Sequence, residues 1–252
     1  MKKIVKILAV VLVLALSATL LCACSNNKDA STGREKLIMG TNAAFPPYEY
    51  YEGDKIVGID AEVGALIAEK LDMDFEIMDM DFNGIISAVQ NGVVDIGMAG
   101  MTVREDRLEH VNFSTTYAKG VQVVIVKDGS NIANLDDLSG KKIGVQEATT
   151  GDAYASEDYG EENVKRYTNG AAAVQALQNG IVDAVIIDNE PAKAFIAANE
   201  GLKILETAYA DEDYAIAVAK ENTELLGKIN TALAELTADG SIDAIVNKYI
   251  PA

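Results

Sequence analysis

The sequence predicts an α/β fold with two similar lobes. Along most of the chain, short apolar runs typical of strands alternate with stretches whose apolar residues recur at helical spacing. The motif Gln-Asn-Gly-(Val/Ile)-Val-Asp also occurs twice, at 90–95 and at 178–183, and the copies lie 88 residues apart. Each copy joins an expected helix to an expected strand, which indicates a repeated lobe or a favourable turn that occurs twice. We expect the repeated lobe, with a cleft between the lobes where a small ligand binds.

The composition is that of a globular protein that carries a strong negative charge. Of the 252 residues, 49% are hydrophobic and only 4 are prolines, so the chain can bury a sizeable core. Acidic residues outnumber basic ones 39 to 21, and the formal net charge is −18. Because such a charge repels phosphate backbones and the sequence has no local basic stripe, we expect no nucleic acid as a partner.

Few residues are available for metal binding or nucleophilic catalysis. The cysteines are Cys22 and Cys24, and the single histidine is His110, so the usual zinc ligand sets cannot be assembled. No G-x-S-x-G motif is present for a serine nucleophile, and no P-loop is present for ATP hydrolysis. Asp211, Glu212 and Asp213 lack the spacing of a calcium loop, and we expect them in a solvated acidic loop. The sequence therefore predicts no metal and no cofactor.

The first residues have the layout of a secretory signal peptide. Lysines near the start precede the apolar run 7–16 and then small residues, which predicts a signal peptide over 1–23. A retained membrane anchor over 7–24 is the alternative. The sequence Leu21-Cys22-Ala23-Cys24 resembles a bacterial lipobox, and the resemblance implies lipidation of Cys24. Residues 24–35 are polar and aperiodic, which is typical of a flexible tether.

The elements of the first half follow in order. A strand at 37–39 precedes a helix that Asp60 could cap, with apolar residues at helical spacing up to Leu71. A strand at 74–77 is followed by a helix at 84–90, which the pair Asn91-Gly92 ends, and by a buried strand at 93–99.

The second half repeats this alternation, and two more helices complete the chain. We expect strands at 142–145, near Val164 and at 183–187, with helices after Gly151, at 171–178 and from Pro191. An amphipathic helix is expected at 221–238, and a last short helix through Val246.

Several blocks of sequence carry a family resemblance. They are Gly40–Tyr50, Gly58–Asp60, Met80–Ile86, Ala99–Thr102 with Arg107, Phe113–Ser114, Thr149–Asp152, Asp183–Asp188 and Ala238–Ser241. In this order they resemble the polar amino-acid-binding proteins of ABC importers, which are family 3 of the solute-binding proteins. The resemblance covers nearly all of the chain from Leu37 to Ile250.

The resemblance implies the two-lobed, type II periplasmic-binding-protein-like fold, in which two hinge strands cross between the lobes. The crossings correspond to 117–121 and 211–215. Lobe 1 would then be discontinuous, made of 36–118 and 215–252, and lobe 2 would be 119–214. Two crossing strands form a hinge between open and closed states.

The resemblance also implies a binding site for a free L-amino acid, which presents a carboxylate and an ammonium. A guanidinium suits the first group and a carboxylate suits the second. Arg107 would hold the ligand carboxylate, and Asp188 the ammonium. The other residues that the resemblance places at the ligand are Asn42, Phe45, Phe82, Gly100, Thr102, Gln146, Thr149 and Thr150.

Each of these assignments has an alternative. Arg107 could belong to a solvated charged turn, and Asp188 could cap the helix that Pro191 begins. Phe45 and Phe82 could be core aromatics rather than the pair that sandwiches the ligand.

Three further positions bear on specificity. Asn42 stands where binders of cationic amino acids often place an acid, so it favours a neutral polar ligand. Glu147 could receive a cation or face solvent, and Tyr117 could be a hinge residue or a pocket wall.

We therefore expect an extracytoplasmic, lipid-anchored, monomeric receptor that delivers a free amino acid to an ABC permease with its ATPase subunit. The chain is expected to be a binding protein and not an enzyme. Two alternatives stay open: a dehydratase of the same fold that acts on cyclic acids, and a ligand sensor for a separate signalling receptor.

Overall fold

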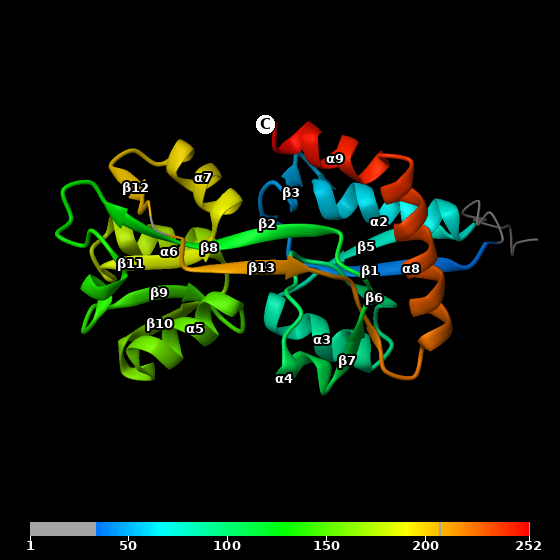
Figure 1. Ribbon diagram of the computed structural model, residues 1–252, viewed down its shortest axis with the longest axis horizontal. Helices are drawn as coiled ribbons and strands as arrows, with labels where there is room; N and C mark the ends of the chain where they lie inside the picture. Colours follow the sequence, from blue (N-terminus) through cyan, green and yellow to red (C-terminus); the bar gives the residue numbers. More distant parts are fainter. Residues whose placement is uncertain (1–33, 207, 252) are drawn as a thin grey trace, which may run out of the picture. The chain divides into compact units, whose positions relative to one another are not determined.

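Two mixed sheets, each covered by helices on both faces, form the body of the protein (Figure 1). The computed structural model describes residues 34–206 and 208–251. The expected signal peptide, the lipidation site Cys24 and nearly all of the expected tether lie outside the described residues. Glu35–Ala252 form one compact unit.

The first sheet has the strand order β5-β1-β6-β14-β7. Its strands are β1 (Lys36–Thr41), β5 (Asp74–Asp79), β6 (Ile96–Gly97), β7 (Val111–Phe113) and β14 (Ala217–Ala219). The helices around it are α2 (Ile59–Lys70), α3 (Phe82–Gln90), α4 (Glu105–Leu108), α8 (Thr223–Ala238) and α9 (Ser241–Tyr249). A small antiparallel sheet, β2 (Ala44–Phe45), β3 (Glu49–Glu52) and β4 (Lys55–Val57), adjoins it.

The second sheet has the order β10-β9-β11-β8-β12, and β13 pairs with β8 as well. Its strands are β8 (Ala118–Lys127), β9 (Ile143–Gln146), β10 (Val164–Tyr167), β11 (Ala184–Asp188), β12 (Leu202–Ile204) and β13 (Ala210–Tyr214). Its helices are α5 (Thr150–Tyr159), α6 (Gly170–Gln178) and α7 (Asn189–Ala198), with short 3-10 turns η1 (Leu135–Leu138) and η2 (Glu161–Asn163).

A ribbon of two antiparallel strands joins the sheets (Figure 1). β8 and β13 pair from Gln122 opposite Ala210 to Ala118 opposite Tyr214. The strand β8 continues into the second sheet, whereas β14 follows β13 into the first. The predicted two-lobed α/β fold is confirmed, and the division into 36–118 with 215–252 and 119–214 stays a prediction.

The repeated motif forms the same turn and the same aspartate hydrogen bond in both sheets. Gly92 and Gly180 each follow a helix with positive φ, 65° and 70°. After each glycine, the aspartate side chain accepts a hydrogen bond from a main-chain amide. Asp95 accepts from Ile38 in β1 at 2.7 Å, and Asp183 accepts from Lys142, just before β9, at 2.8 Å. The aspartate thus fixes the register of the strand that follows the turn.

Three expectations about local structure are wrong. Helix α2 begins at Ile59, and the carbonyls of Pro47 and Tyr48 accept its first amides, so Asp60 does not cap it. The strand expected over 93–99 covers only Ile96–Gly97, because the amide of Val93 still bonds back to Ala88 in the preceding turn.

The third wrong expectation concerns the acidic run at Asp211. This run lies in β13 and not in a solvated loop. Because side chains alternate across a strand, Glu212 is 2% exposed, whereas Asp211 and Asp213 face solvent.

No helix within 34–206 and 208–251 is long and apolar enough to cross a membrane.

We predict that Asp95→Ala lowers the stability of the fold by about 1–2 kcal/mol, because the amide of Ile38 loses a charged acceptor in a partly buried position. The midpoint of thermal unfolding should fall by roughly 2–6 °C. Asp95→Asn keeps an acceptor and should lose less, and Asp54→Ala, in an exposed turn, is the control. Equal midpoints for Asp95→Ala and the control would contradict the role of the motif.

Candidate functional site

One enclosed cavity of about 20 Å³ collects nearly all of the expected ligand-binding residues. Its lining residues are Asn42, Phe45, Glu49, Phe82, Ala99, Gly100, Arg107, Gln146, Thr149, Thr150 and Asp188. Of the residues expected at the ligand, only Thr102 is not among the lining residues. A cavity of this size has room for about one water molecule. The walls from the two sheets are therefore nearly in contact across the site.

Arg107 is buried and its guanidinium is held in place from both sides of the cavity. Nη1 donates to the carbonyl of Thr102 at 2.8 Å, and Nη2 donates to the carbonyl of Ala148 at 2.9 Å. The guanidinium carbon also lies 5.4 Å from the centre of the Phe82 ring, a cation–π contact. Burial, together with the neighbouring Arg104 charge, lowers the pKa of Arg107 to about 10. The side chain stays charged at neutral pH, and it is not part of a solvated turn.

Asp188 ends β11 and is 6% exposed. It stands at the N-cap position of α7 without capping the helix through its side chain. Its carboxylate instead accepts a hydrogen bond from the Tyr214 hydroxyl on the hinge strand β13. Burial raises the pKa of Asp188 to about 6, while the hydrogen bonds from Tyr214 and Gln122 act in the opposite direction. The cavity therefore has a buried carboxylate at the end of β11 and a buried guanidinium on α4.

Gly100 occupies a position where a side chain would clash with Phe45 and the backbone would be strained. Its φ is +52°, and a Cβ atom would lie 2.7 Å from the ring of Phe45. Its amide donates to Asp60 at 2.9 Å, and the Tyr117 hydroxyl donates to the same oxygen at 2.8 Å. Tyr117 is thus buried behind the cavity wall, next to the hinge.

The direct hydrogen bonds across the cavity converge on a short segment of the second sheet, Gln146–Thr149. Gln146 donates to Asn42 at 2.9 Å, and Asn42 donates in turn to the carbonyl of Met80 at 2.9 Å. The exposed Glu147 accepts from Asn83 at 3.1 Å, and the carbonyl of Thr149 accepts from Arg104 at 3.0 Å. Both polar groups of the Asn42 side chain are therefore engaged within the protein.

This segment contains a strained residue. Ala148 has a φ of +64°, in the left-handed region that alanine rarely adopts. Its amide donates to Asp152 at 2.9 Å, and the Thr149 side chain caps α5 through the amide of Asp152. The turn aims the Ala148 carbonyl at Arg107. Thr150, in the first turn of α5, accepts from Gln122 at 3.3 Å.

The structure adds two buried acids that the sequence did not indicate. Glu49 lines the cavity, is 1% exposed, and its Oε2 has no hydrogen-bond partner among the described residues. Neither carboxylate oxygen of Glu212 has such a partner. Burial raises the pKa of Glu212, whereas the nearby side chains of Thr102 and Thr150 and the Arg107 charge lower it. In both cases the signal available in the sequence is strand alternation, which turns one acid of a polar run inward.

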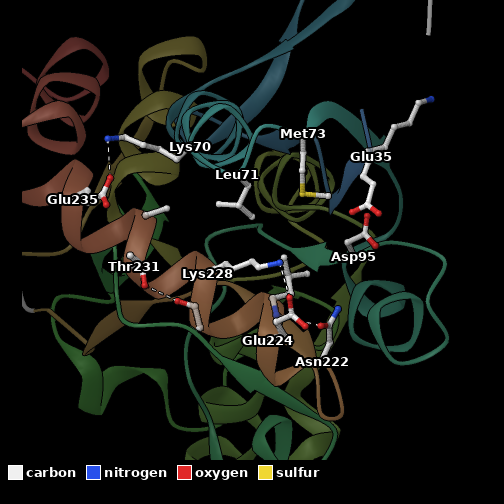
Figure 2. A pocket seen from close by; sticks show the side chains of 14 residues that line it. Glu35, Lys70, Leu71, Met73, Asp95, Asn222, Glu224, Lys228, Thr231 and Glu235 are labelled. Carbon is white, nitrogen blue, oxygen red and sulfur yellow. Dashed lines mark hydrogen bonds and ion pairs between the residues drawn. The ribbon is translucent and has the colours of Figure 1, made fainter. Parts of the chain in front are cut away.

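A second, wider pocket lies elsewhere on the first lobe. Its volume is about 950 Å³, and it lies beside α8 and the start of β1. Figure 2 shows that two of its lysines point to neighbouring glutamates and not to a common centre: Lys70 pairs with Glu235, and Lys228 with Glu224. The cavity at Arg107 is the better candidate, because a buried guanidinium and two buried carboxyl groups line it together. The residues from 34 to 251 that the structure describes include no group of side chains suited to a metal ion.

We predict that Ala148→Gly stabilises the protein by about 1 kcal/mol, because glycine adopts a positive φ without strain. The midpoint of thermal unfolding should rise by roughly 2–4 °C. Ala153→Gly, within α5, is the matched control and should lower it, because glycine is a poor helix former. A lower midpoint for Ala148→Gly would contradict the strained turn.

Comparison with known proteins identifies the family. Residues 37–252 match the family model of bacterial extracellular solute-binding proteins, family 3. The arginine-binding extracellular protein ArtP of Bacillus subtilis (strain 168) is 34% identical, over 91% of this chain and 92% of that protein. An ancestral arginine-binding protein was solved with arginine (42% identity, TM-score 0.81) and with glutamine (41%, 0.83). These structures cover 86% and 87% of this chain, which spans 99% of each of them. The chain belongs to family 3 of the bacterial extracellular solute-binding proteins.

Proposed function

We propose that this protein captures a free L-amino acid between its two lobes, through Arg107 and Asp188. The observation that supports this is the pairing of a buried guanidinium with a buried carboxylate at one small cavity. A zwitterion offers each group its complement, and its binding would compensate the burial of both charges. Asn42, Phe45, Phe82, Gly100, Gln146, Thr149 and Thr150 would complete the site, with Thr102 placed behind it.

The ligand would join the two lobes. Arg107 lies on α4, between two strands of the first sheet, and Asp188 ends a strand of the second. An amino acid that binds both would therefore stabilise the closed arrangement. The cavity, which has room for about one water molecule, cannot admit an amino acid unless the lobes move apart. Bending of the β8–β13 ribbon would open it, with lobe 1 as 36–118 and 215–252 and lobe 2 as 119–214.

We favour a ligand with a cationic side chain, such as arginine, over the neutral polar ligand that Asn42 suggests. Asn42 is engaged by Gln146 and Met80, so it is not free to select the ligand. Glu49 adds a buried acid to the cavity beyond the one that an ammonium requires. The similarity to arginine-binding relatives agrees with this choice.

The family places the protein outside the cytoplasm. We propose that lipid on Cys24 anchors it to the membrane, and that it acts as a monomer which passes its ligand to an ABC permease with an ATPase subunit. We also propose that it is not an enzyme. The dehydratase alternative requires a general acid in place of the ammonium acceptor, and Asp188 supports the acceptor role.

We predict that Arg107→Ala lowers the affinity for L-arginine at least about 30-fold, because the ligand carboxylate loses a buried, charged donor. Asp188→Asn should weaken binding through the ammonium in the same way. Lys203→Ala removes an exposed cation from β12, away from the cavity and the β8–β13 ribbon, and should bind normally. The measurement is isothermal titration of protein first stripped of ligand by unfolding and refolding.

Unchanged affinity in Arg107→Ala would place the ligand elsewhere. Lack of binding by the wild-type protein across the common L-amino acids would contradict the proposed function itself.

A further inference from the structure

Two buried carboxyl groups face each other beside the cavity. Glu49, on β3, is 1% exposed, and Asp60, in the first turn of α2, is fully buried. Oε2 of Glu49 and Oδ1 of Asp60 are both buried, and neither has a hydrogen-bond donor among the described residues. Two such oxygens would be costly to bury as a pair of charged acceptors.

A single proton between the two groups resolves this. The carboxyls lie within hydrogen-bonding reach of each other, so a protonated Glu49 can donate to Asp60. The other oxygen of Asp60 already accepts from the Gly100 amide and the Tyr117 hydroxyl, which favours the charged form of Asp60. Glu49 is therefore the member that carries the proton. In agreement, burial and the nearby Asp60 charge raise the pKa of Glu49 well above its usual range.

The groups around Glu49 are mostly acidic or neutral. Besides Asp60, the carboxylates whose negative charge raises the pKa of Glu49 are Asp79, at the end of β5, and Asp188 of β11. Glu190 of α7 acts in the same way on the adjoining Tyr48, and the two nearby tyrosines are Tyr48, before β3, and Tyr117, before β8. The cation that shares the cavity, Arg107, donates to the carbonyls of Thr102 and Ala148. A proton or a cation from outside is thus what the pair requires.

We propose that the cationic end of the ligand takes the place of this proton, so that capture of a cationic amino acid releases one proton from Glu49. The step is an exchange: the neutral carboxylic acid of Glu49 gives its proton to solvent, and the resulting carboxylate pairs with the guanidinium of the ligand. Asp60 stays charged and keeps its two donors. The proposal rests on the proposed capture of an amino acid at this cavity.

The exchange has a definite pH dependence. Protons compete with the ligand wherever Glu49 is protonated in the free protein, so the affinity for arginine rises with pH, by up to tenfold per unit. A neutral ligand of the same shape displaces no proton from Glu49. Citrulline, which carries a urea in place of the guanidinium, is that ligand.

The test is isothermal titration of the stripped full chain with L-arginine and with L-citrulline, in buffers of different ionisation enthalpy, between about pH 5 and pH 8. The dependence of the heat on the buffer gives the number of protons released. Asp188 titrates near pH 6 and faces the ammonium that both ligands share, so its contribution cancels in the difference. We expect arginine to release close to one proton more than citrulline at the acidic end of the range.

Two variants test whether Glu49 is the group that releases the proton. Glu49→Gln keeps a donor toward Asp60 and should abolish the difference between the ligands, whereas Glu52→Gln, exposed on the same strand, should preserve it. Equal proton release for the two ligands, or a difference that survives in Glu49→Gln, would overturn the proposal. The wild-type comparison stands even if Glu49→Gln does not fold. If arginine does not bind at all, the cationic ligand class itself fails, which is a distinct result from binding without proton release.

Discussion

The pairing of β8 with β13 is the constraint on which the site depends. This ribbon joins the two sheets, and its residues support the cavity from behind. Tyr214 on β13 donates to Asp188, and Gly120 on β8 leaves room for the tyrosine, since a Cβ atom there would lie 2.1 Å from the hydroxyl. Gln122 on β8 supports Thr150. Because the hinge and the site share these residues, bending of the ribbon and ligand binding are expected to be coupled.

Buried charge is the second organising feature. Arg107 lies on one side of the cavity, while Glu49, Asp60, Asp188 and Glu212 are buried around it. Burying so many acids with one cation is unfavourable unless protons or a ligand compensate them. A zwitterion with a further positive charge would bring the missing cations. Under the proposed function, this excess of buried acid would give a cationic amino acid an advantage over a neutral one.

The sequence predicted the architecture well because strand and helix periodicity, the repeated Gln-Asn-Gly turn and the family resemblance agree. It also identified Arg107, Asp188 and Gly100 as candidate ligand-binding residues, because each lies in a block of sequence that resembles the family. The roles of Asp60, Glu49 and Glu212 were missed for a physical reason. Whether an acid in a polar run faces solvent or the interior depends on strand pairing with distant segments, as β13 pairs with β8. The hydrogen bond that engages Asn42 was missed similarly, because its partner Gln146 is 104 residues away.

The most direct test of amino-acid capture is a crystal structure of the protein grown with L-arginine. We expect one arginine enclosed between the lobes, its carboxylate at Arg107, its ammonium at Asp188 and its guanidinium at Glu49. Arginine bound at another surface, such as the pocket beside α8, or a cavity that binds none in a protein shown to bind arginine in solution, would contradict it.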